Sequence, residues 1–207
     1  MSTIDALMEN EEGRQFLRDH VRWDPEAGGY WVTVYDKGEP QTVLVTEVIK
    51  EGTMTDGKPG IVSPYETAIL DVFGWDEVRG KFPWVGPARV VGADSDTSVK
   101  IFSDIATAAE ESGGSIDGGV TLAATLPNPF GEYWDAGVAD ADGNSITIQV
   151  PENHVLEVVE IRPDGMIGIR NPWGYWRVSG AGESVSGVVY LTLEEFNGTF
   201  MSVTVTR

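Results

Sequence analysis

The sequence predicts an α+β protein, because helical patterns are concentrated in its first half and alternating strand patterns fill its second half. The pattern changes between about residues 95 and 118. We therefore divide the chain into residues 1–97, a small mixed part with helices and strands, and residues 98–207, a β-rich subdomain. A chain of 207 residues can form one well-cored domain or two small lobes that share a cleft.

The first half begins with a weakly amphipathic segment over residues 3–20, which Gly13 interrupts. The stretches GGYWVTVYD and QTVLVTEVI then alternate with a period of two around KGEP, which predicts a β-hairpin. Further along, SPYETAILDVFGW carries the clearest helix start of the chain. We expect Ser63 as the N-cap, Pro64 at the first helical position, and Glu66 returning a bond to the Ser63 backbone N–H.

A second helix is predicted over residues 98–112, ended by Gly113 and Gly114. Its expected buried stripe is Val99, Phe102, Ile105, Ala106 and Ala109. The rest of the chain is predicted to be β, with the candidate strands GVTLAATL, WDAGVAD, SITIQV, HVLEVVEI, MIGIR, GVVYLTL and TFMSVTVT. A Pro-Asp-Gly turn predicts a hairpin between HVLEVVEI and MIGIR. Thr192 and Glu195 form a capping box for a short helical turn before the last strand.

Composition excludes several classes of partner and site. The net charge of −19 would repel a phosphate backbone or an anionic lipid surface, so we expect neither nucleic acid nor membrane as a partner. The same charge could attract a basic protein or peptide. The chain has no cysteine, which removes disulfides, thiolate metal sites and a thiol nucleophile. No apolar run approaches the ~20 residues of a membrane span, and no signal peptide is visible; we expect a soluble protein, cytoplasmic or exported.

The chain has two histidines, and one of them has a suggestive partner. His20 ends a polar helical segment, where a surface role is expected. His154 begins an alternating strand and Asn171 ends its predicted hairpin partner, so the two should lie within hydrogen-bonding reach. In thiol proteases a histidine is the general base and an asparagine oxygen fixes its tautomer. The alternative is a purely structural contact between His154 and Asn171 at a sheet edge.

The residues around this pair resemble the C-terminal part of the calpain-like cysteine proteases. The tetrapeptide NPWG at 171–174 matches that family letter for letter, and GVVYLTLEEFNGTFMSVTV is similar to the segment that follows it. His154 falls where the catalytic histidine of the family stands. Weaker likeness extends upstream through the early hairpin, so the resemblance covers residues 29–206, with its specific motifs in 154–206.

This resemblance implies a papain-like fold and assigns catalytic roles to His154 and Asn171. It also assigns substrate-binding roles to Trp173 and Gly174. Trp173 could instead be an ordinary core residue. The aromatic cluster in this glycine-containing loop favours partial exposure of its members, which are Trp173, Tyr175 and Trp176.

The chain departs from the family pattern at the nucleophile. The family carries its cysteine in a Gly-x-Cys-Trp helix start well before the early hairpin, and neither the cysteine nor that motif occurs in this sequence. Asn153 replaces the glycine that usually precedes the catalytic histidine. The calcium ligands of the family find no match, so we expect no cofactor, and calcium enters through the resemblance alone. The acidic stretches ADSDT at 93–97 and DADGN at 140–144 are turns, and a plain hairpin turn is favoured over a calcium loop for the second.

Three functions are compatible with the sequence. The first is a calpain-like endopeptidase domain without its nucleophile. It is either a pseudoprotease that binds peptide or a subunit that supplies His154 and Asn171 to a separate Cys-bearing chain. The second is a non-catalytic peptide- or protein-binding or toxin-accessory module that retains the fold. The third is a hydrolase with an unrelated carboxylate pair, which nothing in the sequence selects. Under the first function the isolated chain is expected to be inactive.

Overall fold

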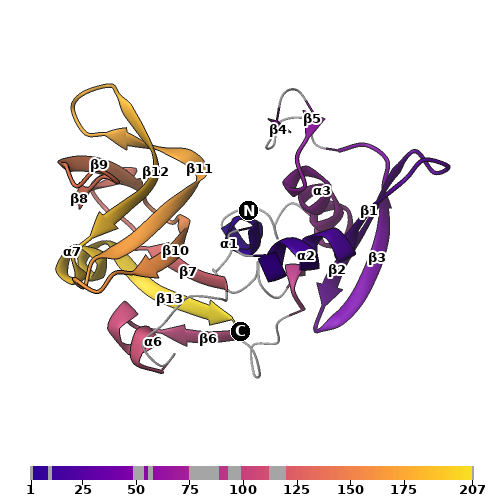
Figure 1. Cartoon of the computed structure of the whole chain (residues 1–207), viewed down its shortest axis with the longest axis horizontal. Coiled ribbons are helices and arrows are strands. Elements are labelled where there is room, and N and C mark those ends of the chain that lie inside the picture. Colours follow the sequence, from indigo (N-terminus) through magenta and orange to yellow (C-terminus); the bar gives the residue numbers. More distant parts are fainter. Residues whose placement is uncertain are drawn as a thin grey trace. The chain divides into compact units, whose positions relative to one another are not determined.

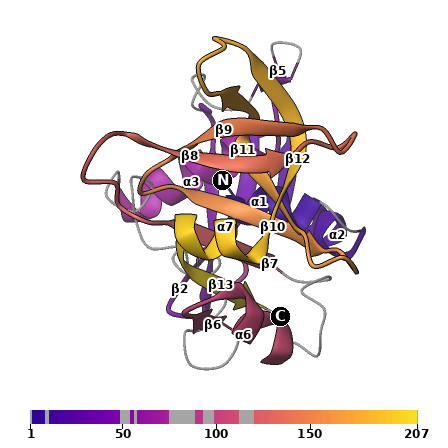
Figure 2. The ribbon, with the colours of Figure 1, turned by 90° about the vertical axis from the view of Figure 1, so that its left-hand side faces the viewer.

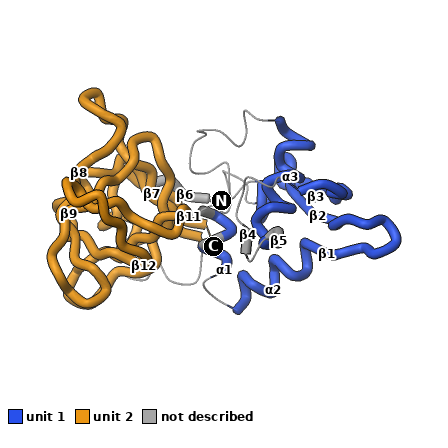
Figure 3. Tube along the Cα trace, turned by 90° about the horizontal axis from the view of Figure 1, so that it is seen from above, with its two compact units in different colours: residues 1, 3–99 blue, residues 2, 100–207 orange. Residues whose placement is uncertain are grey.

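The computed structural model describes residues 2–8, 11–48, 54–55, 58–74, 89–92, 99–111 and 120–206. The chain divides into two compact units, coloured separately in Figure 3. The first spans residues 1 and 3–99, and the second spans residues 2 and 100–207. The architecture is α+β, as predicted, with a small sheet in the first unit and a large antiparallel sheet in the second.

The first unit packs helices on a three-stranded antiparallel sheet (Figure 1). Lys37 and Gly38 both have positive φ, so the predicted β2–β3 hairpin closes through a two-residue turn. Strand β1 was not predicted, because four residues are too few to show a period. The elements are α1 (Ser2–Met8), α2 (Glu11–His20), β1 (Val21–Asp24), β2 (Gly29–Asp36), β3 (Glu39–Val45), β4 (Met54–Thr55), β5 (Lys58–Pro59) and α3 (Val62–Phe73).

Helix α3 begins earlier than predicted. Ile61 takes the N-cap position, and among the described residues no side chain caps the helix. Ser63 lies inside the first turn, where it is fully buried and its carbonyl accepts a bond from the Thr67 hydroxyl at 2.9 Å. The predicted capping box is therefore wrong. Val62, only 2% exposed, is part of the core of this unit, and its burial places the helix start ahead of Ser63.

The predicted helix over residues 98–112 is also wrong in its first part. Residues Val99–Phe102 form strand β6, and the helix α6 covers only Ile105–Glu111. The Asp104 carboxylate accepts the Thr107 N–H at 2.7 Å, so an acidic residue that the pattern did not single out opens the helix. Helical spacing failed here because the segment changes from strand to helix within a few residues.

The expected stripe of that helix changes accordingly. Phe102 and Ile105 are buried as predicted, although Phe102 belongs to the strand. Ala106 is exposed and Ala108 is buried in its place. The Val99 side chain and the glycines expected to end the helix lie outside the described residues.

The second unit is built on a sheet with strand order β12-β8-β9-β11-β10-β7-β13-β6. Strands β7 to β13 pair antiparallel and correspond to the predicted strands. Strand β12 pairs with β11 as well as β8, so β8, β9, β11 and β12 form a closed ring. The strands after β6 are β7 (Val120–Thr125), β8 (Tyr133–Ala139), β9 (Ser145–Pro151), β10 (Val155–Ile161), β11 (Ile167–Val178), β12 (Ser184–Leu191) and β13 (Phe200–Thr206).

Two short helices cover this sheet. Helix α7 (Leu193–Thr199) packs on β8, β12 and β13, and α6 packs on β13 and on α7 (Figure 2). The predicted capping box is present, because Thr192 accepts the Glu195 N–H at 3.2 Å and Glu195 accepts the Thr192 N–H at 3.0 Å. None of the described helices is long and apolar enough to cross a bilayer. The largest fully buried side chains of the core cluster of this unit are Ile105, Ile148, Leu156, Ile167, Ile169, Trp176, Leu191 and Phe196.

Candidate functional site

The candidate site lies in the second unit, where β10 begins beside the middle of β11. His154 directly precedes β10, and Asn171 lies within β11. Strands β10 and β11 form the predicted antiparallel hairpin, with Val158 opposite Ile169 and Glu157 opposite Arg170. This register brings His154 Nε2 to 3.2 Å from Asn171 Oδ1, the proximity that the turn between them predicts.

The main chain of His154 is held by Thr125 at the end of β7. The His154 N–H donates to the Thr125 hydroxyl oxygen at 2.8 Å, and the His154 carbonyl accepts from the Thr125 N–H at 2.9 Å and from its hydroxyl at 3.2 Å. Asn153, just before, has φ +48°. Glycine or asparagine suits this left-handed backbone, which accounts for an asparagine where the family resemblance expects glycine.

Asn171 fixes the orientation of the imidazole. Its side chain is 3% exposed, and its Nδ2 donates to the Tyr175 carbonyl at 2.9 Å. Its Oδ1 accepts the Trp173 N–H at 3.1 Å, so the oxygen must be the atom that faces the ring. His154 Nε2 therefore carries a hydrogen and donates it to Asn171. In neutral imidazole the lone pair is then on Nδ1, for which the described residues provide no hydrogen-bond partner.

The environment keeps this ring neutral. Burial lowers the pKa of His154 below its ordinary value of 6.5, and the bond to Asn171 opposes this with a smaller effect. The indole of Trp173 contributes to the enclosure, with its ring centroid 4.5 Å from that of His154. At pH 7 the site thus presents a neutral, oriented base with one accepting nitrogen.

The NPWG tetrapeptide is a bulge inside β11 and not the loop after the end of a strand that the sequence predicts. Arg170 pairs with Val188 and Tyr175 with Ser186, so residues 171–174 stand opposite the single residue Gly187. Gly174 has φ +79° and Gly187 has φ +87°, conformations that glycine adopts without strain.

The bulge divides the aromatic cluster between surface and core. Trp173 is 51% exposed and Tyr175 is 39% exposed, in agreement with the expected partial exposure. Trp176 is 1% exposed and donates its indole N–H to the Gly187 carbonyl at 3.0 Å, so for this residue the expectation is wrong. The reason is strand alternation: Trp176 points to the face of β11 opposite to that of Tyr175 and Arg177, which are both exposed.

In the described part of the chain, no nucleophilic side chain bonds to the His154 ring. The chain has no cysteine, and among the described residues no serine or threonine hydroxyl bonds to the His154 ring. The arrangement can accept and hold a proton at Nδ1, but a second group must provide the atom that attacks. Thr125 was missed by sequence reasoning, because its place beside His154 depends on the pairing of β7 with β10, which no local pattern reveals.

The acidic turn at 140–144 is a hairpin turn between β8 and β9, the favoured interpretation. The Asp140 carboxylate accepts from the side chain and the backbone N–H of Asn144, and from the Asp142 N–H; these bonds, with the Asn144 side chain first, lower its pKa. The described residues hold no cluster of three or more histidine, aspartate or glutamate side chains suited to a metal ion. The other acidic turn, at 93–97, lies outside the described residues.

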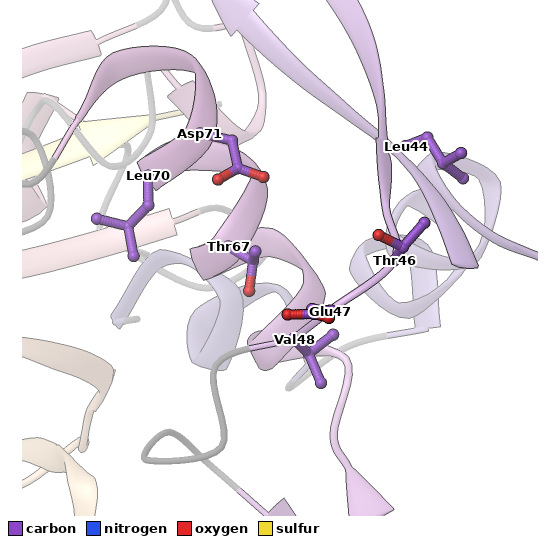
Figure 4. A pocket seen from close by; sticks show the side chains of 7 residues that line it. All are labelled: Leu44, Thr46, Glu47, Val48, Thr67, Leu70 and Asp71. Carbon is purple, nitrogen blue, oxygen red and sulfur yellow. The ribbon is translucent and has the colours of Figure 1, made fainter. Parts of the chain in front are cut away.

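A cavity of about 520 Å³ lies in the first unit, between the end of β3 and α3 (Figure 4). It is lined by the side chains of Leu44, Thr46, Glu47, Val48, Thr67, Leu70 and Asp71. Glu47 and Asp71 give it a negative rim, while Thr67 is occupied with the Ser63 carbonyl. The cavity contains none of the residues of the His154 site.

Comparison with models of known protein families finds no match to this chain, and comparison with curated protein sequences finds no relative. The functional interpretation therefore depends on the geometry of the site and on the NPWG motif.

Proposed function

We propose that this chain is the part of a calpain-like cysteine-peptidase domain that carries the general base and its orienting amide, without the nucleophile. The observation that carries the proposal is the bond between His154 Nε2–H and Asn171 Oδ1, which leaves Nδ1 as the proton acceptor. The α+β architecture, with both residues on a β-rich unit, supports the papain-like fold that the resemblance implies.

The chemistry assigned to this pair follows from its tautomer. A thiol brought to Nδ1 by a separate polypeptide would pass its proton to that nitrogen, leaving a thiolate and an imidazolium. Asn171 Oδ1 then accepts the bond from the positively charged ring through the same Nε2–H. The neutral state of His154 is the form that this step requires, and burial favours it.

Labelling of a captured thiol tests the proposal. The purified chain serves as bait for proteins of its source cell, and the captured fraction is treated with a fluorescent iodoacetamide at pH 6. A cysteine paired with His154 should label rapidly at a pH where an ordinary thiol, with a pKa of about 8.5, is almost entirely protonated. The rate should fall at least about tenfold with His154→Ala as bait, because the base is lost.

His20→Gln is the matched control, since His20 is the other histidine of the chain and bonds to Tyr35 and to the Phe16 carbonyl. It should leave the labelling rate unchanged. Rapid labelling that ignores His154, or the absence of any rapidly labelled thiol, would count against the proposal.

A second candidate is a non-catalytic peptide- or protein-binding or toxin-accessory module that retains the fold. The exposed rings of Trp173 and Tyr175 favour it, because exposed aromatic side chains beside a polar site are frequent in binding surfaces. Under this function a partner is captured, but no thiol in it depends on His154.

A further inference from the structure

An exposed stripe of side chains extends from the His154 site along β11. Trp173 contacts the His154 ring, and its own ring centroid lies 6.5 Å from that of Tyr175. Two residues further on, Arg177 places its guanidinium 5.5 Å from the Tyr133 ring centroid and donates to the Tyr133 hydroxyl at 3.3 Å. We call the set Trp173, Tyr175, Arg177 and Tyr133 the aromatic stripe.

Arg177 differs from the other two arginines between residues 120 and 206. Arg162 pairs with Asp164 at 2.9 Å, and Arg170 lies 3.8 Å from Glu157. Arg177 is exposed and, within the described part of the chain, makes no ion pair with a carboxylate. A positive charge that is held in place by an aromatic ring on a protein of net charge −19 is available to a negatively charged ligand.

The residues opposite Tyr175 and Arg177 on the neighbouring strands carry no charge. Ser186 stands opposite Tyr175, and Arg177 lies between Ser184 on one side and Gln149 on the other. These neighbours are small or uncharged and can donate and accept hydrogen bonds. Tyr175 and Arg177 lie in the regular part of β11 and share one face at about 7 Å, which is also the spacing of alternate side chains in an extended peptide. The Trp173 ring, which belongs to the bulge, reaches to 6.5 Å from the Tyr175 ring centroid.

We propose that the aromatic stripe binds an extended peptide that passes the His154 site, with an apolar side chain on Tyr175 and a carboxylate two positions away at Arg177. The inference rests on the proposed function, because it takes the peptide at His154 as the starting point. It gives that function a substrate class: peptides with an acidic residue shortly beyond an apolar one. The overall acidity of the chain favours a basic partner, but the stripe itself carries the positive charge of Arg177, and the nearest carboxylate in register, Asp135, lies one strand further away, beyond Gln149.

A linear polysaccharide is the main alternative ligand for exposed aromatic rings. Sugar rings stack on open aromatic faces. Here one face of Trp173 is covered by His154, the Tyr133 ring lies under Arg177, and Trp173 and Tyr175 are inclined to each other by 35°. The peptide is therefore the better fit.

Binding of two matched peptides tests the proposal. The probes are acetyl-Glu-Ala-Phe-Ala-Glu-amide and the same peptide with Gln in place of both Glu residues, so that either chain direction places an acidic side chain near Arg177. Dissociation constants are measured by ¹H–¹⁵N NMR titration at 0.15 M salt, where charges beyond about 8 Å are screened. Wild type should bind the Glu peptide about threefold more tightly, the size expected of an exposed ion pair.

Variants then assign the effect to the stripe. Arg177→Gln should abolish the preference for Glu, and Tyr175→Ala should weaken both peptides by about fivefold. Arg162→Gln is the matched control: it removes the same charge from an arginine that also lies over a tyrosine ring, that of Tyr190, and it should keep the preference. Equal binding of both peptides to wild type, equal effects of the two arginine variants, or binding of cellohexaose with neither peptide bound would overturn the proposal.

His154→Gln separates this proposal from the proposed function. The variant removes the base and keeps the stripe, so the preference for the Glu peptide should persist. If the preference persists and depends on Arg177 while thiol labelling is independent of His154, the stripe is established and the peptidase role fails. If labelling depends on His154 and the preference is absent, the reverse holds.

Discussion

At the scale of single residues, the site depends on one amide that makes three hydrogen bonds. Asn171 accepts from His154 and from the Trp173 N–H, and it donates to the Tyr175 carbonyl. The pair could be predicted from sequence, because a hairpin turn fixes which residues of its two strands lie close together. Thr125 and Arg177 could not, since their contacts cross to strands that are distant in sequence.

Replacement of Asn171 by alanine should release the His154 tautomer and destabilise the fold. The change leaves two donors and a carbonyl without their partner in a buried place, at a cost of about 1–3 kcal/mol. Asn144→Ala, in an exposed turn, should cost about 0.5 kcal/mol. Imidazole ¹⁵N shifts report the tautomer and urea unfolding reports the stability. An unchanged Nε2–H tautomer in the variant would show that Asn171 does not set it.

The lowered pKa of His154 makes stability depend on pH. Since the folded protein binds this proton less readily than the unfolded chain, the contribution of the neutral ring is fully present above pH 6.5 and is lost as the pH falls toward the folded pKa. The free energy of unfolding of wild type relative to His154→Gln should therefore decrease from pH 7.5 to pH 5. Urea titrations of both proteins across this range measure it. Parallel curves would contradict the burial of a neutral imidazole.

At the scale of elements, sequence patterns predicted the structure correctly where the interacting residues are close in sequence. They failed where contacts with distant parts of the chain determine the secondary structure. The Thr192–Glu195 capping box formed as predicted, whereas Ser63 lost its capping role because Val62 is drawn into the core. Residues Val99–Phe102 show helical spacing but pair with β13 as β6. The NPWG bulge was taken for a turn, because its continuation of β11 depends on β12.

Two exposed glycines, Gly174 in the bulge and Gly198 in a helix, allow the cost of positive φ to be separated from the usual effect of replacing glycine by alanine. A Cβ atom at Gly174 or at Gly198 meets no atom within 4 Å, but Gly174 has φ +79° while Gly198 lies in α7. Gly174→Ala should cost about 1 kcal/mol, and Gly198→Ala should be neutral or stabilise by up to about 1 kcal/mol. Thermal unfolding of both variants measures these changes. Equal effects would show that the bulge does not require glycine.

At the scale of the whole molecule, the residue types that the chain contains restrict its possible reactions more than its fold does. The α+β class could be predicted from the distribution of periodicities. The identity of a partner could not, because a net charge of −19 describes the average surface, while Arg177 gives the stripe the opposite sign.

The purified chain should not hydrolyse peptides on its own. His154 is an oriented base, but with no cysteine in the chain there is no thiolate to attack a carbonyl carbon, and base and orientation alone leave only residual catalysis. Casein and fluorogenic peptides with acidic residues, with and without calcium, provide the assay, and His154→Ala provides the comparison. Background cleavage that is equal in both proteins belongs to a contaminant. Cleavage that co-purifies with wild type and disappears in His154→Ala would mean that a nucleophile other than cysteine completes the site within this chain.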